Sequence, residues 1–227
     1  MTVKIDDRLL SAASFVKKGA SVIDVGTDHA YLPVHLIESE IAVRALATDI
    51  NEGPLNNAKE TIREAGLETR IATRLAGGLD GAEDFHADTV MICGMGGELI
   101  ADILDRAPFV KDPSIRLILQ PMTFGDHLRK YLLSNGFRIV DEALSTDNKK
   151  LYTCICTEYD GVVREYNEIE LLIGKHNLER RSDPLRAPFI EREIRKLETI
   201  RRGKEQGGLN FSAEQGMIDR LRKHLEE

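Results

Sequence analysis

The chain has 227 residues, of which 42% are hydrophobic and 30% charged, and its net charge is −7. This length allows one α/β domain and a small appendage, and the composition is that of a globular protein that needs no disulfide staples. No run of about 18 apolar residues occurs and the N-terminus lacks an apolar signal, so we expect a cytoplasmic protein without a membrane span.

Charge is distributed unevenly along the chain. Residues 160–227 carry 14 basic and 14 acidic side chains, so the whole net charge of −7 belongs to residues 1–159. Any RNA partner would therefore be held by local basic clusters, and no DNA partner is expected. The cysteines Cys93, Cys154 and Cys156 lie in apolar runs, which predicts reduced core thiols and no metal site.

Residues 1–159 alternate short apolar runs with helical segments, which indicates an α/β fold with a mostly parallel sheet. After five strands, the last two are joined by the polar run STDNKK, which predicts an antiparallel terminal hairpin. This arrangement is typical of the class I Rossmann-like methyltransferase sheet. The expected strands are Ala20–Val25, Val43–Asp49, Ile71–Leu75, Thr89–Cys93, Ile115–Gln120, Phe137–Ala143 and Leu151–Glu158, and the helices are Tyr31–Ser39, Pro54–Ala65, 97–104 and Asp126–Ser134.

Residues 160–227 form a second, all-α domain in this interpretation. Helices are expected over Tyr166–Leu178, Ala187–Lys204 and Ser212–Leu225, and the pair Gly207-Gly208 separates the last two. A helical hairpin or a short antiparallel coiled coil follows from this pattern.

A cofactor site is expected where the strands end, because ligands of open α/β sheets bind beyond the carboxyl ends of the strands. The first strand ends at Asp24 and Gly26, and Asp49 ends the second, where a carboxylate can accept two ribose hydroxyls. The turn lacks the spacing Gly-x-Gly-x-x-Gly and carries Asp28, which would repel a phosphate but attract a sulfonium and an α-amino group. The turn therefore favours S-adenosylmethionine over NAD.

The pair Gly77-Gly78 after the third strand and the three glycines of Gly94-Met95-Gly96-Gly97 after the fourth extend this site. They allow a close approach of the backbone to a ligand, although plain turns would also explain them. The cofactor-binding residues predicted at the strand ends are Asp24, Gly26, Asp49, Ile50, Gly77, Gly78, Leu79, Gly94 and Met95.

Four segments together resemble a bacterial family that methylates N1 of the adenine at position 22 of tRNA: DVGTDHAYLP (24–33), TDINEGPL (48–55), MICGMGGELI (91–100) and LILQPM (117–122). The resemblance covers nearly the whole chain and implies S-adenosylmethionine as cofactor and tRNA as substrate. Two departures stand out. The general class I pattern has glycines at the positions of Asp28 and Ala30, and many adenine methyltransferases carry an Asn/Asp-Pro-Pro-aromatic stretch in place of Gly94–Gly97.

Residue roles follow as hypotheses. N1 of adenine attacks the sulfonium methyl in line, and Asp28, or else His29, stabilises the cationic product or takes a proton from it. N1 lies on the pairing edge, so the base must be unpaired and stacked on a surface. The predicted substrate-binding residues are Tyr31, Gly96, Gly97, Gln120, Pro121 and Met122, with Phe124 as a further stacking candidate, and Arg192, Arg195 and Lys196 for tRNA phosphates.

The sequence also allows other interpretations of the basic cluster and of the function. The basic cluster could be a solvated face paired with Glu191, Glu193 and Glu198. The enzyme could methylate a small molecule or a protein, with the helical domain as a lid or dimer arm. A non-catalytic scaffold that binds a partner through the coiled coil is a further alternative.

Overall fold

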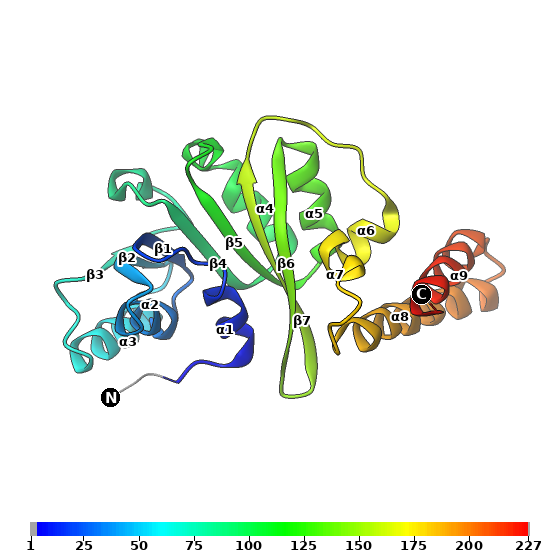
Figure 1. Cartoon of the computed structure of the whole chain (residues 1–227), viewed down its shortest axis with the longest axis horizontal. Coiled ribbons are helices and arrows are strands. Elements are labelled where there is room, and N and C mark those ends of the chain that lie inside the picture. The colour runs from blue at the N-terminus through cyan, green and yellow to red at the C-terminus, as the bar shows by residue number, and fades with distance from the viewer. Residues whose placement is uncertain (1–3, 227) are drawn as a thin grey trace. The chain divides into compact units, whose positions relative to one another are not determined.

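The computed structural model describes residues 4–226, which divide between Arg164 and Glu165 into two compact units (Figure 1). The larger unit is built on seven strands with helices between them, and the smaller unit is all helical. The strands are β1 (Ala20–Val25), β2 (Ala42–Asp49), β3 (Ile71–Leu75), β4 (Thr89–Gly96), β5 (Arg116–Thr123), β6 (Phe137–Asp147) and β7 (Lys150–Tyr159). The helices of the larger unit are α1 (Asp7–Ala13), α2 (Tyr31–Glu38), α3 (Glu52–Glu64), α4 (Gly97–Asp105) and α5 (Gly125–Ser134), with short 3-10 turns η1 (Ala82–Phe85) and η2 (Pro108–Lys111).

The strands form one sheet in the order β3-β2-β1-β4-β5-β7-β6. Strands β1 to β5 are parallel, and β7 runs antiparallel to both β5 and β6. The predicted class I Rossmann-like methyltransferase fold is therefore confirmed. The order changes direction between β1 and β4, so the carboxyl ends of these two strands flank the switch point at which such sheets bind ligands.

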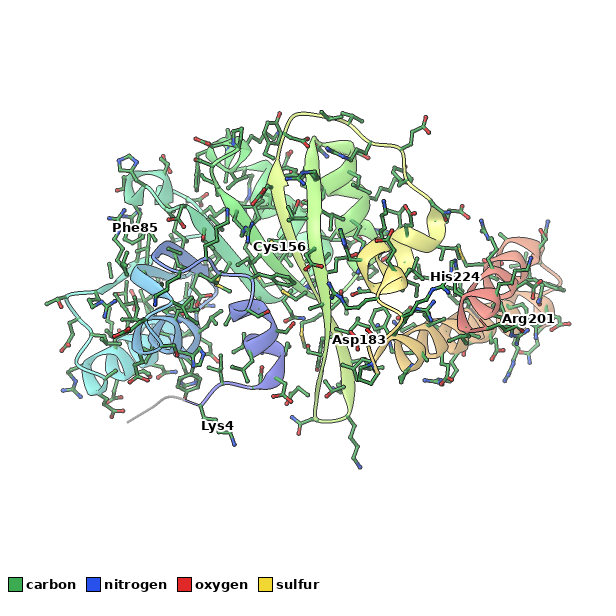
Figure 2. All side chains as sticks on the ribbon, in the orientation of Figure 1. Lys4, Phe85, Cys156, Asp183, Arg201 and His224 are labelled. Atoms are coloured by element: carbon green, nitrogen blue, oxygen red, sulfur yellow. The ribbon has the colours of Figure 1, made fainter. Side chains whose placement is uncertain are left out.

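Two hydrophobic clusters cover the two faces of this sheet. One joins buried residues of α1, α2 and α3 to β1 and β2, and the other joins α4 and α5 to β4 and β5. All six residues of β1 are buried, as a strand covered on both faces should be. Cys156 lies within the sheet of this unit (Figure 2), and Cys154 and Cys156 are buried free thiols.

The terminal hairpin is longer and its turn tighter than the sequence pattern predicted. The run STDNKK (145–150) is not a loop, because β6 continues to Asp147 and β7 begins at Lys150. Only Asn148 and Lys149 make the turn, and both have positive φ angles, 47° and 64°. Two such residues match the twist of a two-residue hairpin turn, so polar residues in this run belong to the strands.

The smaller unit contains α6 (Glu168–Ile173), α7 (Lys175–Glu179), α8 (Arg186–Gln206) and α9 (Ser212–Glu226). The single helix expected over Tyr166–Leu178 is wrong: Gly174, with φ 95° and ψ 132°, separates α6 from α7. Helices α8 and α9 pack together as the expected helical hairpin, and Gly207 caps the end of α8.

Within residues 4–226, no helix is long and apolar enough to span a membrane. Across the same residues, no group of three or more His, Cys, Asp or Glu side chains is placed to hold a metal ion.

Candidate active site

The turn after β1 forms the floor of the site. The backbone N–H groups of Gly26 and Thr27 both donate to the carbonyl oxygen of Thr48, at 2.8 and 3.0 Å, which binds this turn to the end of β2. Gly26 has φ 74°, and a Cβ at this position would lie 2.2 Å from Cε of Met95. Glycine is therefore favoured here by the backbone conformation, whereas the methyl end of the flexible Met95 side chain could shift to admit a Cβ.

Asp24 is the buried carboxylate of this floor. Its side chain accepts a hydrogen bond of 2.6 Å from the hydroxyl of Thr27, and the residue is only 5% exposed. Burial raises the pKa of Asp24 to about 6, although the bond from Thr27 lowers it. A cationic group placed beside this carboxylate would stabilise its charged form.

The two candidate catalytic residues lie next to each other at the rim. Nε2 of His29 is 3.8 Å from Oδ2 of Asp28, and the Asp28 side chain is 73% exposed. The His29 ring stacks on Tyr31, with centroids 5.0 Å apart and planes inclined by 8°. Ala30 adopts φ 54° at the start of α2, the left-handed conformation that a glycine would adopt without strain. At Ala30 the departure from the general glycine pattern therefore keeps a left-handed backbone.

The ends of β2 and β3 supply the next group of predicted residues. Asp49 accepts a hydrogen bond from the N–H of Asn51, which fixes its carboxylate, and the following Ile50 is 70% exposed. An exposed apolar side chain directly after an acid suits a nucleoside, with the acid at the ribose and the apolar group at the base. Leu79 is buried within the sheet core, so it is not free to cover a ring as expected, whereas Gly77 and Gly78 are partly exposed.

The expected strand end at Cys93 is too early, because β4 continues to Gly96, and the glycines at its end have different physical causes. Gly94 adopts φ 82°, and its N–H donates to Oε1 of Gln120. At Gly97, a Cβ would lie 2.2 Å from the carbonyl oxygen of Phe124, so glycine there allows the starts of α4 and α5 to pack back to back. The prediction that a ligand requires all three glycines is thus unnecessary for Gly97, while Met95 and Gly96 remain partly exposed near the strand end.

The end of β5 corrects one expected role. Gln120 is fully buried, and its amide is bonded within the protein: Oε1 accepts from Gly94 and Arg8, and Nε2 donates to the carbonyl of Pro121. The structure therefore does not place Gln120 where it could read a base edge. Pro121 is also buried, whereas Met122 and Phe124 are 45% and 52% exposed and remain candidates for contact with a base.

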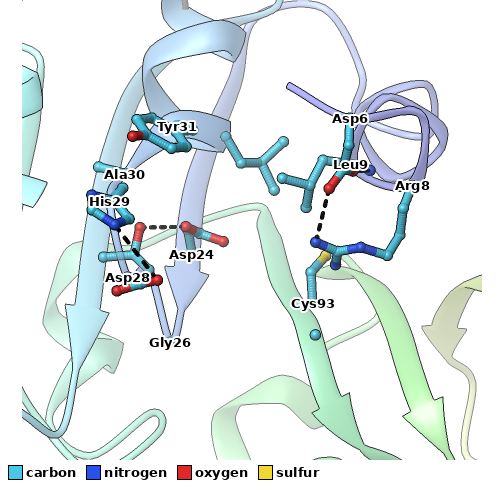
Figure 3. A pocket seen from close by; sticks show the side chains of 13 residues that line it. Asp6, Arg8, Leu9, Asp24, Gly26, Asp28, His29, Ala30, Tyr31 and Cys93 are labelled. Carbon is cyan, nitrogen blue, oxygen red and sulfur yellow. Dashed lines mark hydrogen bonds and ion pairs between the residues drawn. The ribbon is translucent and has the colours of Figure 1, made fainter. Parts of the chain in front are cut away.

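One wall of the site was not predicted from the sequence. Helix α1 and the residue before it bring Asp6, Arg8 and Leu9 against the ends of β1 and β4 (Figure 3). Together with the β1 turn they enclose a pocket of about 360 Å³. The signal was present, because Asp6 caps the helix by accepting from the N–H of Leu9. The pocket is lined by Asp6, Arg8, Leu9, Asp24, Gly26, Thr27, Asp28, His29, Ala30, Tyr31, Leu32, Cys93 and Gly94.

The basic residues predicted for tRNA lie on α8 in the smaller unit, and each has an acidic neighbour. Arg192 and Lys196 pair with Glu193 at 2.7 and 3.0 Å, and Arg195 pairs with Glu191 at 3.6 Å. Glu193 is buried, while the Arg195 and Lys196 side chains are about 60% exposed (64% and 59%). The cluster is therefore paired with glutamates, as one interpretation of the sequence expected. The side chains of Arg195 and Lys196 nevertheless remain exposed to solvent.

The site has the features that a sulfonium nucleoside needs. A buried carboxylate lies at the end of β1, a second carboxylate with an exposed apolar neighbour ends β2, and the turn that begins at Gly26 is hydrogen-bonded to the end of β2. Fold and site together define a methyltransferase of the Rossmann-like class. Residues 5–155 match the methyltransferase domain family.

Similar proteins narrow this class. The tRNA (adenine(22)-N(1))-methyltransferase of Bacillus subtilis is 32% identical over 191 residues, which are 84% of this chain and 76% of that protein. A protein of the NADB-Rossmann superfamily from Streptococcus agalactiae superposes with a TM-score of 0.89 at 32% identity and covers 99% of both chains. A putative tRNA (m1A22) methyltransferase from Streptococcus pneumoniae, solved in complex with S-adenosyl-L-methionine, superposes with a TM-score of 0.85 at 32% identity. The match covers 96% of this chain and 99% of that one. The chain belongs to the tRNA (adenine(22)-N(1))-methyltransferase family.

Proposed function

We propose that this enzyme transfers a methyl group from S-adenosylmethionine to N1 of the adenine at position 22 of tRNA. The observation that carries the proposal is the pocket between β1, β4 and α1 in a chain that matches the Bacillus subtilis enzyme over most of its length. When bound, S-adenosylmethionine supplies an electrophilic methyl group on a sulfonium. In this proposal the buried Asp24 and the hydrogen-bonded Asp49 hold its two ends, and the exposed Ile50 covers its base.

Asp28 is the proposed catalytic residue. Neutral adenine N1 has no proton, so direct in-line attack needs no strong base beforehand, but the methylated base carries a positive charge. The exposed Asp28 carboxylate at the pocket rim can stabilise that charge or accept a proton from N6, and His29 is the second candidate. Tyr31, held by its stack on His29, and the exposed Met122 and Phe124 offer surfaces on which an unpaired base can stack.

Asp28→Asn separates catalysis from cofactor binding. We expect turnover to fall at least about 100-fold, within the range attributed to positioned acid–base groups, while affinity for S-adenosylmethionine in calorimetry changes by less than about threefold. Unchanged turnover would remove Asp28 from the mechanism. A large loss of cofactor affinity would instead assign Asp28 to holding the cofactor's amino group.

The main test of the proposed function uses unmethylated tRNA and radiolabelled S-adenosylmethionine, with nucleoside analysis of the product. Label in 1-methyladenosine is expected from a transcript with adenine at position 22, and none from the same transcript with guanine there. Label in both transcripts would show methylation elsewhere. No label, despite cofactor binding, would favour a small-molecule or protein substrate.

We further propose that the smaller unit contributes to tRNA binding through Arg195 and Lys196. The pair of Arg195 with Glu191 joins two exposed side chains and contributes little, so a phosphate can replace the glutamate. Lys196 bonds the buried Glu193 with one of its three N–H donors, and its exposed ammonium can contact a phosphate with another. In the variant with both residues changed to alanine, tRNA binding should weaken, and the slope of log affinity against log salt should become shallower by up to roughly two. Lys175→Ala, a similarly exposed lysine of the same unit, is the control. An unchanged salt slope in the double variant would exclude the cluster.

A further inference from the structure

Arg8 is a charged residue of the pocket that none of the roles above uses. It extends from α1 toward the ends of β4 and β5, so its guanidinium lies beside Cys93 and faces the pocket across from Asp24 (Figure 3). Nη1 donates to Oε1 of Gln120 at 2.7 Å, and Nη2 donates to Oδ2 of Asp6 at 3.2 Å. Two elements that are far apart in the sequence thus hold this cation at the pocket wall.

The position of the guanidinium is fixed by a buried acceptor. Oε1 of the fully buried Gln120 also accepts from the N–H of Gly94 at 3.1 Å, so one oxygen joins Arg8 to the turn after β4. The Arg8 side chain is only 17% exposed. A guanidinium has five N–H donors, and the bonds to Gln120 and Asp6 use two of them. Donors therefore remain for a ligand in the pocket.

The charges of the pocket are arranged in two groups. The β1 turn contributes the carboxylates of Asp24 and Asp28, and the start of α1 contributes the guanidinium of Arg8 together with Asp6, the carboxylate that accepts a hydrogen bond from it. The methionine end of S-adenosylmethionine carries a cationic amine and sulfonium together with an anionic α-carboxylate. The carboxylates of the turn suit its cations, but the α-carboxylate would lose solvent here and needs a cationic donor.

We propose that Arg8 binds the α-carboxylate of S-adenosylmethionine, and that Gln120 is the positioning residue that orients the guanidinium for this contact. The inference rests on the cofactor of the proposed function. It assigns to helix α1 the recognition of the amino-acid end of the cofactor, and it explains why β5 carries a fully buried amide at Gln120. The site thereby distinguishes the intact cofactor from nucleosides that lack the carboxylate.

The test compares binding of S-adenosylmethionine with binding of decarboxylated S-adenosylmethionine, which keeps the sulfonium and the amine but lacks the α-carboxylate. Both are titrated calorimetrically into the full-length protein, its Arg8→Gln variant and the control Arg138→Gln. Arg138 is an exposed arginine on β6 that forms an ion pair with Glu158 on the neighbouring strand β7. Glu158 lies opposite Arg116, at the amino end of β5, whereas the pocket lies toward the carboxyl ends of the parallel strands. Arg8→Gln should weaken S-adenosylmethionine binding by roughly 10- to 100-fold, as expected for a hydrogen bond to a charged group.

The decarboxylated compound decides the cause of that loss. Its affinity should differ by less than about threefold between the wild-type protein and Arg8→Gln, and Arg138→Gln should leave both affinities unchanged. Equal weakening of both compounds would overturn the proposal, because Arg8 would then act only by supporting the pocket. Unchanged binding of S-adenosylmethionine would overturn it as well.

Folding and function are controlled separately. Thermal unfolding checks that Arg8→Gln is folded; if it is not, Arg8→Lys gives the same comparison, because a lysine lacks the planar donor pair. A wild-type preference for the intact cofactor that persists undiminished in Arg8→Lys would then count against the inference. None of these titrations contains tRNA, so a protein that binds the cofactor through Arg8 but methylates no tRNA would contradict the proposed function alone.

Discussion

Replacing Asp24 by asparagine should stabilise the cofactor-free protein while weakening cofactor binding. The carboxyl group is buried, and its pKa is raised from 3.8 to about 6, chiefly by loss of solvent. Between these values the folded protein holds a proton that the unfolded chain has released. Stability from this group is therefore fully present below pH 3.8 and is lost as the pH rises through about 6. Asparagine keeps an acceptor for the Thr27 hydroxyl but carries no charge.

The magnitude follows from the pKa shift. A shift of about two units corresponds to about 3 kcal/mol, an upper limit for the cost of the ionised carboxylate above the folded pKa. By linkage, roughly half of this cost is already present at pH 5. The difference in unfolding free energy between Asp24→Asn and the wild type should therefore grow by about 1–1.5 kcal/mol from pH 5 to pH 8.

Urea unfolding of the cofactor-free protein at these two pH values measures this difference, and calorimetry measures the loss of affinity for S-adenosylmethionine. Thr27→Val is the companion variant: it deletes the hydrogen bond that lowers the Asp24 pKa, so the stability loss should extend to higher pH. A variant Asp24→Asn that is no more stable than the wild type at pH 8, or whose advantage is the same at both pH values, would refute the reasoning.

Three further outcomes are expected. Gly97→Ala places a Cβ 2.2 Å from the Phe124 carbonyl oxygen, so urea unfolding should show a free energy of unfolding lower by about 2–3 kcal/mol. The control Gly53→Ala, whose added Cβ would have no atom within 4 Å, should be neutral or slightly stabilising in the same titration. Asp49→Ala should weaken S-adenosylmethionine binding by roughly 10- to 100-fold in calorimetry without lowering the melting temperature; a smaller effect would place the ribose elsewhere. Glu142→Ala removes the buried carboxylate that Nε of Arg129 contacts at 2.6 Å and should cost about 3–5 kcal/mol in urea unfolding. A loss under about 1 kcal/mol would show that the other contacts of Arg129, such as its bond to Thr153, compensate.

The strand order and most of the site could be predicted because buried parallel strands leave clear apolar runs, and their ends place Asp24, Gly26 and Asp49 at one edge. Polarity alone does not locate the turn of the hairpin, because polar residues of the run 145–150 belong to β6 and β7. The outer part of this hairpin is only partly buried, so its strands can carry polar residues, and the turn is marked instead by two consecutive left-handed residues, Asn148 and Lys149.

Other features depend on tertiary contacts that no local pattern records. Helix α1 has only 7 residues, and its place in the pocket depends on a bond from Arg8 to a residue 112 positions away. Gln120 looked like a ligand-reading residue because it ends a strand at the site, but its amide is satisfied internally. Gly97 looked like a ligand contact for the same reason, and packing against Phe124 explains it.

The bond between Arg8 and Gln120 also bears on how the enzyme matures. During synthesis α1 emerges before β5, and Gln120 follows Arg8 by 112 residues, so this wall of the pocket cannot form until the chain has been made through β5. Chains that stall before that point have no complete pocket to offer. S-adenosylmethionine then stabilises only molecules that have finished this step, by mass action. The cellular supply of the cofactor would thus favour survival of correctly completed chains over partly folded ones exposed to proteolysis.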